Sequence, residues 1–372
     1  MLNIPKLVVL NLTTDCNMRC EYCYASAGEC RSYMSQEIAI KTIKELKEIN
    51  EDGKIKILFH GGEPLLCLDV IKSVIKFCEE NYRREDVDYY IQTNCVLLNK
   101  DVITYLKEKN VKISISIDGC DYLSNSCRIL VDGQNSFDII KRAMDEMNNQ
   151  NVLINCLAVL NENNYLFVDK IIDFFVENNV HNFSFNYFIK GGRGNQNSHL
   201  ALSNDKLFQA TKKIIDKIEE YYKKGIILNE KNVYYLVRSI ATSKKLYMCA
   251  NSPCGAGLNL FGITPEGDIY PCDDLSSQNQ FCLGNIKEKH LKDILESPII
   301  NYFACCNYDK IRECKNCNLK KYCGAGCCSR KFYENDDIYS KDPICEFYKL
   351  VVPYVQNLLK SNYISKAIYN LE

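Results

Sequence analysis

The segment LTTDCNMRCEYCYA (12–25) carries three cysteines, Cys16, Cys20 and Cys23, within eight residues. It directly follows KLVVLNL (6–12), an apolar run with the composition of a β-strand. A structural metal site usually takes four protein ligands. A set of three thiols therefore suggests that a fourth coordination position is kept open for another molecule.

The overall composition excludes several classes of protein. The chain has 372 residues, of which 47% are hydrophobic and 25% are charged, and its formal net charge is -1. Such a balance creates no field that favours nucleic acid or an anionic membrane. No apolar run approaches the ~20 residues of a membrane helix, and the N-terminus lacks the features of a secretory signal. These features predict a cytoplasmic protein that binds neither nucleic acid nor membrane.

The cysteine content is the anomaly in this composition. The chain has 22 cysteines, bunched toward both ends with metal-ligand spacings, and four histidines. In a large chain without a secretory signal, this pattern indicates metal binding rather than disulfides. With so few histidines, we expect thiolate ligands rather than zinc sites that use imidazole.

Short apolar runs alternate with amphipathic segments over the first two-thirds of the chain. The predicted strands are 6–12, 55–60, 88–93, 111–117, 152–159 and 181–188, and the predicted helices are 35–49, 68–82, 100–109, 136–149, 165–179 and 204–224. Six strand–helix units in sequence predict an α/β fold in which a parallel sheet curls into a partial (β/α)6 barrel.

The composition of the sequence changes near residue 240. Cysteine and glycine become more frequent, and turn signals such as PEGD (265–268) appear. We therefore predict two domains, a barrel over 1–240 and a cysteine-rich domain over 241–372. The second is expected to end in a helical region that begins at Cys345.

The spacing Cys16-x3-Cys20-x2-Cys23 after a first strand resembles the radical S-adenosylmethionine (SAM) superfamily. The resemblance implies a [4Fe–4S] cluster on these three thiolates, with an open iron that binds the amino and carboxylate groups of SAM. It also implies that an electron from the cluster cleaves SAM to methionine and a 5′-deoxyadenosyl radical, which abstracts a hydrogen atom. The alternative from spacing alone is a zinc site that borrows a distant fourth ligand.

The GGEP motif (61–64) after the second strand extends this resemblance. In the family, a GGE motif at this place contacts SAM. Glycines such as Gly61 and Gly62 let the backbone approach the methionine moiety, and the carboxylate of Glu63 can hold its ammonium group. An ordinary turn is the alternative.

Five further residues are expected to contact the cofactor. Ser116 and Asp118, at the end of the fourth strand, match the family's ribose and carboxylate contacts. Asn94 ends the third strand and is predicted to line the pocket. Tyr24 is predicted to pack on the adenine, and Arg128 to pair with the methionine carboxylate. For Tyr24 and Arg128, a packing or surface role is the alternative.

The C-terminal cysteines resemble the SPASM domain of peptide-modifying radical SAM enzymes. The resemblance implies two auxiliary [4Fe–4S] clusters; Cys254, Cys272 and Cys327 match ligands of the first, and Cys314, Cys317, Cys323 and Cys345 match those of the second. Cys249, five residues before Cys254, is placed to complete the first cluster. From spacing alone, a pair of zinc ribbons is the alternative, because tetrathiolate sites suit both zinc and iron–sulfur clusters.

One acidic residue and one histidine stand out beside these motifs. Asp273 follows Cys272, and in the related anaerobic sulfatase-maturing enzymes an Asp at the matched position is the proposed base that deprotonates the substrate. A solvated turn acid is the alternative. His60 departs from that family, which commonly has Gln before the GGEP motif.

The sequence thus predicts a radical SAM enzyme that abstracts a hydrogen atom from a residue of a ribosomal peptide and forms a thioether or carbon–carbon cross-link. The many additional cysteines favour this prediction. An anaerobic sulfatase maturase, which makes formylglycine from Cys or Ser, is the alternative that similar length, Asp273 and LGN (283–285) favour. A non-catalytic iron–sulfur or zinc module is an alternative of another class.

The predicted cofactors and partners follow from these resemblances. We expect SAM and three [4Fe–4S] clusters, one that binds SAM and two that are auxiliary. The expected partners are a peptide or protein substrate, an electron donor such as flavodoxin or ferredoxin, and a separate leader-binding protein.

Overall fold

The computed structural model describes residues 5–50, 53–242, 249 and 251–360 of the chain. Within them, ten strands form one sheet in the order β10-β9-β8-β1-β2-β3-β4-β5-β6-β7. The strands are β1 Leu7–Asn11, β2 Ile55–His60, β3 Val87–Thr93, β4 Lys112–Ser116, β5 Asn155–Val159, β6 Asn182–Asn186, β7 Asn229–Glu230, β8 Leu260–Ile263, β9 Asp268–Tyr270 and β10 Gly284–Asn285.

The first seven strands pair with one another in parallel, in chain order. Their C-terminal ends consequently meet at one edge of the sheet; for example, Asn11 at the end of β1 is in register with His60 at the end of β2. The predicted α/β fold with a parallel sheet of six strand–helix units is confirmed. Loops at this edge carry the functional groups in folds of this type.

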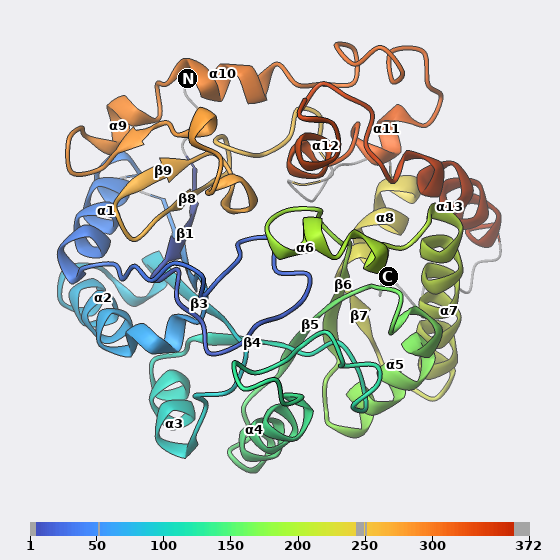
Figure 1. Ribbon diagram of the computed structural model, residues 1–372, viewed down its shortest axis with the longest axis horizontal. Helices are drawn as coiled ribbons and strands as arrows, with labels where there is room; N and C mark the ends of the chain where they lie inside the picture. The colour runs from blue at the N-terminus through green and yellow to red at the C-terminus, as the bar shows by residue number, and fades with distance from the viewer. Residues whose placement is uncertain (1–4, 51–52, 243–248, 250, 361–372) are drawn as a thin grey trace.

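The described α-helices are α1 Gln36–Ile49, α2 Leu68–Asn81, α3 Lys100–Glu108, α4 Phe137–Asn149, α5 Val168–Glu177, α6 Arg193–Gln196, α7 Asn204–Lys223, α8 Lys231–Thr242, α9 Leu291–Ile294, α10 Pro298–Ala304, α11 Lys320–Cys323, α12 Cys328–Asn335 and α13 Cys345–Leu358. Helices α1 to α5 and α7 form a ring on the outer side of the sheet, whereas α6 lies near the centre of this ring, as Figure 1 shows. The predicted helix over 165–179 begins as an α-helix at Val168, because residues 165–167 form a 3₁₀ turn.

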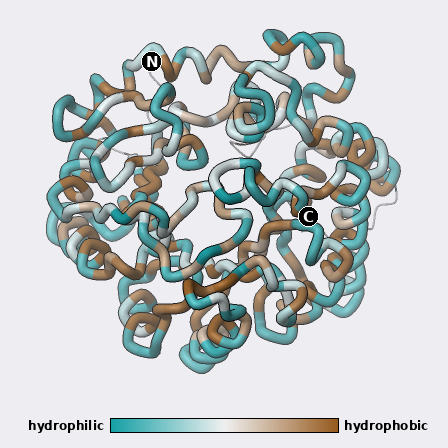
Figure 2. The backbone as a smooth tube through the Cα atoms, in the orientation of Figure 1, coloured by the Kyte–Doolittle hydropathy of each residue, from teal (hydrophilic) through white to brown (hydrophobic). Residues whose placement is uncertain are grey.

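Alternating burial along the strands places the core between the sheet and these helices. In β2, Ile55, Ile57 and Phe59 are fully buried while Lys56 is exposed, and α1 buries Ile43 and Leu46 against the same core. Figure 2 shows hydrophobic and hydrophilic residues alternating along the helices that surround the sheet. None of the described helices combines the length and the apolar character that a bilayer crossing requires.

The C-terminal region extends the sheet of the barrel. Strand β8 pairs in parallel with the free edge of β1, with Leu7 opposite Leu260, and β9 and β10 continue the sheet in antiparallel fashion. The predicted domain boundary at 240/241 falls in the last turn of α8, and residues 243–248 lie outside the described part of the chain, so that the boundary stays a prediction. The predicted terminal helical region is observed as α13, and its residues 361–372 also lie outside the described part.

Candidate active site

The loop after β1 contains the three N-terminal cysteines and is fixed by its own backbone. Cys16, Cys20 and Cys23 are all half-buried, and the amide of Cys23 donates a hydrogen bond to the carbonyl of Cys20 at 3.2 Å. The Arg19 guanidinium donates to the carbonyls of Cys16 at 2.7 Å and of Gly28 at 3.0 Å. The cationic side chain thus closes the loop around the thiols.

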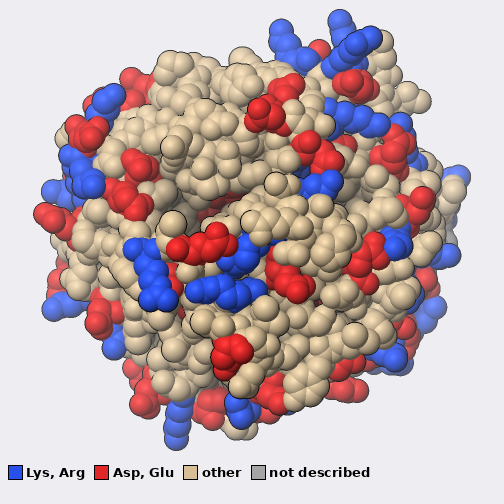
Figure 3. All heavy atoms as spheres, in the orientation of Figure 1, with Lys and Arg blue, Asp and Glu red and all other residues tan. Residues whose placement is uncertain are grey.

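A cavity of about 410 Å³ lies against this loop at the C-terminal edge of the parallel strands. Figure 3 shows a hollow on this face, with basic and acidic side chains at its rim. The cavity brings together most of the predicted site residues; those on its wall are Cys16, Cys20, Cys23, Tyr24, Gly61, Gly62, Asn94, Ser116, Arg128, Cys249, Asp273 and Cys327. Both halves of the sequence therefore contribute to one site.

The two glycines of the GGEP motif hold the second loop close to the first. Gly61 has a φ of +121°, and a Cβ on it would lie 2.5 Å from the carbonyl oxygen of Thr13. A Cβ on Gly62 would lie 1.9 Å from the carbonyl oxygen of Asp15. The glycines are required by this backbone contact with the cysteine loop, in addition to any approach of a ligand from the cavity.

Glu63 lies behind the cavity wall rather than on it. Its buried carboxylate accepts hydrogen bonds from the Thr93 hydroxyl at 2.7 Å and from the amides of Asn94 at 2.8 Å and Leu65 at 3.1 Å. Burial raises the pKa of Glu63 to about 7. In this arrangement Glu63 holds Asn94, whose amide group lies 3.5 Å from the Cys16 sulfur. The role of Glu63 as a direct cofactor contact stays a prediction.

Arg128 and Asp118 belong to one buried network. Arg128 Nη1 donates to the hydroxyl of Tyr22 at 2.7 Å, and that hydroxyl donates to Asp118 Oδ2. Asp118 also accepts from the Val159 amide at 3.0 Å and does not line the cavity, so its ribose contact stays a prediction. Ser116 does line it, and its hydroxyl accepts a hydrogen bond from Gln92 at 2.8 Å.

The buried Nε of Arg128 has no hydrogen-bond partner among the described residues. Arg128 is 6% exposed and lines the cavity beside the cysteine loop. An unsatisfied buried donor on a cation is costly and indicates an anionic ligand. This observation fits the predicted pairing of Arg128 with a methionine carboxylate.

Asp273 lies on the cavity wall, accepts hydrogen bonds from two side chains and lies close to a third. The Asn11 amide group donates to Oδ1 at 2.5 Å, the Tyr24 hydroxyl donates to Oδ2 at 2.6 Å, and His60 Nδ1 lies 3.4 Å from Oδ2. Burial and the charges of Asp273 and Asp274 raise the pKa of Tyr24 well above its usual value. The predicted stacking of Tyr24 on adenine is not tested by this contact and stays a prediction.

The thiols of the first loop fit an iron–sulfur cluster chemically. Burial raises the pKa of Cys16 to about 12 and that of Cys20 to about 11, so that the thiolates need a bound cation to form. Among the described residues, no three His, Cys, Asp or Glu side chains converge as ligands of a single metal ion would. A cubane cluster does not require such convergence, because each thiolate binds a different iron.

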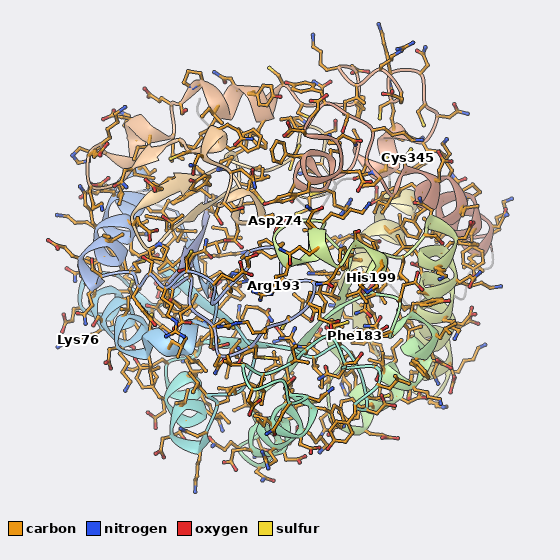
Figure 4. All side chains as sticks on the ribbon, viewed as in Figure 1. Lys76, Phe183, Arg193, His199, Asp274 and Cys345 are labelled. Atoms are coloured by element: carbon orange, nitrogen blue, oxygen red, sulfur yellow. The ribbon has the colours of Figure 1, made fainter. Side chains whose placement is uncertain are left out.

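The C-terminal cysteines form two groups. Cys249 and Cys327 line the cavity. Burial, then the charge of Asp274 and then the neighbouring thiols of Cys327 and Cys254 raise the pKa of Cys272, so that these thiols lie close together. Burial, and then the charges of Cys345 and Cys317, raise the pKa of Cys314, and Cys323 is close to the same three thiols. Figure 4 shows Cys345 toward the edge of the molecule and Asp274 near its centre. The second group therefore lies away from the cavity.

A segment that the sequence analysis did not single out clamps the cysteine loop. The amide of Arg193 donates to the carbonyl of Cys23, its Nε to Cys20 and its Nη1 to Ala27, at 3.0, 3.0 and 3.1 Å. Gly192, with a φ of +50°, allows the close approach, because a Cβ there would lie 2.5 Å from the carbonyl oxygen of Tyr24. Figure 4 shows Arg193 near the centre of the ring. The signal that the sequence offered for this segment is the glycine-rich stretch GGRG (191–194), which follows shortly after the sixth apolar run.

Two sequence profiles match the chain. The profile of the radical SAM superfamily matches residues 10–174, and that of the SPASM iron–sulfur cluster-binding domain matches residues 254–318. The first contains the three-cysteine loop and the GGEP motif. The second contains Cys254, Cys272 and Asp273.

Relatives and a solved structure resemble the chain over nearly its whole length. A cysteine-type anaerobic sulfatase-maturating enzyme of Clostridium novyi is 25% identical over 97% of both chains. The radical SAM cyclopropyl synthase TigE of Paramaledivibacter caminithermalis is 26% identical over 93% of this chain and 73% of that protein. The structure of native anSMEcpe with bound AdoMet and Kp18Cys peptide superposes with a TM-score of 0.84 at 23% identity, over 96% of this chain and 98% of the other. The chain therefore carries a radical SAM domain and a C-terminal SPASM domain, the organisation of a radical SAM enzyme.

Proposed function

We propose that this radical SAM enzyme abstracts a hydrogen atom from a side chain of a ribosomal peptide and forms a thioether or carbon–carbon cross-link. One observation carries the proposal: the three-cysteine loop and the Asp273–His60 pair share one cavity of about 410 Å³. Removal of a hydrogen atom and of a proton can thus occur at one bound residue. The TigE relative is named a cyclopropyl synthase, and the formation of a carbon–carbon bond by a relative supports bond formation as the outcome here.

The cofactors would be held by residues from both domains. Cys16, Cys20 and Cys23 would hold the cluster that binds SAM, with Arg128 at the methionine carboxylate and Gly61 beside it. SAM and the reduced cluster would supply the radical that removes the hydrogen atom. Two auxiliary clusters would be held by Cys249, Cys254, Cys272 and Cys327 and by Cys314, Cys317, Cys323 and Cys345.

The partners of the reaction are also proposed. A flavodoxin or ferredoxin would supply the electron for SAM cleavage, and a separate protein would bind the leader of the peptide substrate. A peptide in the related anSMEcpe structure supports a substrate of this class.

A sulfatase maturase is the second candidate, and a specific observation favours it. The Clostridium novyi enzyme matches 97% of this chain and 97% of its own length, and Asp273 lies on the cavity wall. Mass spectrometry of candidate peptides separates the two functions. A product that is two hydrogens lighter, resists thiol alkylation and carries no aldehyde supports cross-linking, whereas an aldehyde-reactive product supports formylglycine formation.

The proposed class of reaction has its own test. After anaerobic reconstitution, three cubanes imply roughly 12 iron and 12 sulfide per chain. The triple variant Cys16→Ala, Cys20→Ala, Cys23→Ala should lose about a third of that iron and all formation of 5′-deoxyadenosine. A protein isolated anaerobically with zinc and no iron would show that the site is a zinc module.

A further inference from the structure

We propose that Lys331 is a buried counter-charge shared by the two auxiliary clusters, and that the thiols of Cys306 and Cys328 connect it to Cys254 of the first. The inference rests on the proposed function, because it needs iron–sulfur clusters bound by the SPASM domain. It assigns a role to two cysteines that match no ligand position. The argument depends on the burial of Lys331 and on the groups around it.

Lys331 is a cation in the core of the SPASM domain. It lies in α12 and is 1% exposed. Its ammonium group donates a hydrogen bond to the Cys306 sulfur at 3.4 Å. In the part of the chain that the structure describes, this is its only hydrogen bond, and no carboxylate forms an ion pair with it. Because an ammonium group has three hydrogens to donate and a buried charge without a counter-charge is costly, an anion is expected beside Lys331.

The nearest acidic group, Asp342, does not supply this anion. Its carboxylate accepts two hydrogen bonds from the Arg330 guanidinium, at 3.2 and 2.7 Å. It also accepts from the amides of Cys327 at 2.7 Å and Ile344 at 3.0 Å. Since Arg330 already balances the charge of Asp342, the pair is neutral toward Lys331.

Two thiols connect Lys331 to a predicted cluster ligand. Cys306 and Cys328 are each 2% exposed, and Cys328 donates to the Cys306 sulfur at 3.7 Å. The thiol hydrogen of Cys306 is directed to the carbonyl of Ile338 at 3.1 Å, so that Cys306 is neutral in this arrangement. Cys328 also lies within hydrogen-bonding reach of Cys254, which packs against the same hydrophobic cluster. When Cys254 is an iron-bound thiolate, the hydrogen of Cys328 can turn to it.

The charge of Lys331 also reaches the second group of cysteines. Cys314 is 8% exposed and belongs to the same hydrophobic cluster as Cys306 and Cys328. The positive charge of Lys331 acts on both Cys254 and Cys314, which are predicted ligands of different clusters. Lys331 therefore lies close to both predicted sites.

A cation at this place favours the reduced form of a cluster. A [4Fe–4S] core on four thiolates is anionic and becomes more negative when it takes up an electron. A nearby positive charge and a hydrogen bond to a ligand sulfur both stabilise the more negative form. Their effect is strong here, because the thiols lie among the buried rings of Phe281, Phe303 and Phe332 rather than in water. Lys331 should consequently raise the reduction potentials of both auxiliary clusters.

This effect suits the electron balance of the proposed reaction. A substrate that has lost a hydrogen atom to the 5′-deoxyadenosyl radical and then a proton keeps one surplus electron. Transfer of that electron to an auxiliary cluster oxidises the substrate to a closed-shell product and reduces the cluster by one electron, and no atom moves. A higher potential makes this transfer more favourable.

Potentiometric titration of the anaerobically reconstituted holoenzyme, followed by EPR, tests the inference with dithionite as reductant and without peptide. Addition of SAM identifies the signal of the cluster that binds it. Lys331→Met keeps the length of the side chain and removes its charge. We expect reduction of both auxiliary clusters to become about tenfold less favourable, a fall of about 59 mV in potential, while the SAM-binding cluster is unchanged.

Lys349→Met is the matched control. Lys349 stands four residues after Cys345, as Lys331 stands four residues after Cys327, and both of these cysteines are predicted ligands. The Lys349 side chain is 50% exposed and pairs with Glu346 at 2.9 Å, so that its charge is screened by water and by its partner. The variant should therefore keep the potentials of the wild type.

The thiols provide a second pair of variants, which tests the inference if Lys331→Met does not fold. Cys328→Ala removes the donor beside Cys254 and should lower the potential of one auxiliary cluster only. Cys328→Ser keeps a donor and should restore the potential of the wild type. Equal potentials in Cys328→Ala and the wild type would show that this thiol does not connect Lys331 to the first cluster.

Two results with Lys331→Met would overturn the inference. Unchanged auxiliary potentials would assign the counter-charge to a thiolate of Cys306 instead. An equal fall at all three clusters would indicate a general loosening of the fold rather than the loss of a local charge. Because the titration needs no turnover, failure of the proposed function is a separate result: a peptide left unconverted by an enzyme with the expected potentials contradicts that function and leaves the role of Lys331 intact.

Discussion

The hydroxyl of Tyr24 donates a hydrogen bond to Asp273 across 249 residues of sequence, at 2.6 Å. Tyr24 follows the last cysteine of the N-terminal loop, and Asp273 follows Cys272 of the SPASM domain. The contact therefore links two segments that are expected to hold different clusters. It also places the Asp273–His60 pair at a fixed position relative to the first loop.

Removal of the Tyr24 hydroxyl should weaken this link. Tyr24→Phe keeps the ring and removes a hydrogen bond to a carboxylate, so that the free energy of unfolding should fall by about 1.5 kcal/mol or more. Tyr33→Phe is the matched control, because Tyr33 also donates to a carboxylate, that of Asp15 at 2.6 Å, but is 52% exposed. Anaerobic urea unfolding of the two holoproteins measures the difference. Equal losses in both variants would show that the Tyr24 contact has no special role in joining the domains.

Gly62 should be essential for the geometry of the cysteine loop. In Gly62→Ala the new Cβ would lie 1.9 Å from the Asp15 carbonyl oxygen, so that the loop must move and the iron bound after reconstitution should fall. Gly53→Ala is the control, because its Cβ would meet Asn50 at an ordinary 3.5 Å. Iron analysis and 5′-deoxyadenosine formation check the result. Normal iron and normal SAM cleavage in Gly62→Ala would mean that the two loops can separate without loss of the site.

The elements of the barrel could be predicted because each depends on local sequence. The alternation of Ile55, Ile57 and Phe59 with Lys56 is visible in the sequence and reappears as alternating burial in β2. The cysteine loop and GGEP could likewise be placed, since each follows a predicted strand. Strands β9 and β10 have three and two residues, too few for a periodic signal, and they form through pairing with distant segments.

Side-chain partners in the site could not be predicted in the same way. The motif indicates that Glu63 is near the cavity, but the direction of the turn after β2 decides that its carboxylate points to Thr93 and Asn94. The contact of His60 with Asp273 depends on the addition of β8 beside β1, which no local pattern specifies. Arg193 was missed for a related reason, because its bonds to the cysteine loop go to the backbone carbonyls of Cys20 and Ala27 and to the distant side chain of Glu29, which no local pattern links to it.

Cys249 is predicted to complete the first auxiliary cluster. Cys249→Ala should lower the iron content by up to about a third, while cleavage of SAM on the other cluster continues. Cys305→Ala is a suitable control, because Cys305 is exposed and matches no ligand position. Iron analysis and the visible spectrum under anaerobic conditions report the outcome. Full iron with an unchanged spectrum in Cys249→Ala would indicate an open iron in that cluster, which could then bind a substrate thiolate and would favour thioether chemistry.

Glu230 should make the stability of the protein depend on pH in an unusual direction. Its buried carboxylate accepts hydrogen bonds from the amides of Val233 at 2.6 Å and Phe185 at 2.8 Å, and burial raises its pKa to about 7. Between the ordinary carboxyl pKa and this value, the folded state binds more protons than the unfolded state. The contribution of Glu230 to stability therefore falls as the pH rises through this window, and it is recovered when the pH is lowered.

The variant Glu230→Gln cannot titrate and isolates this contribution. Relative to the variant, the wild type should gain about 1.4 kcal/mol of stability when the pH is lowered from 8 to 6. Nearly all of this gain arises in the one pH unit below the pKa of about 7, where the folded state binds one more proton than the unfolded state. Urea midpoints of the anaerobic holoproteins at several pH values measure the difference. Glu296→Gln, at an exposed position, controls for the loss of one charge. Buried Asp274 and Glu63, whose pKa values are also raised, are the same in both proteins and cancel. A wild type that instead loses stability relative to Glu230→Gln on acidification would mean that its hydrogen bonds to Val233 and Phe185 hold the carboxylate ionised despite its burial.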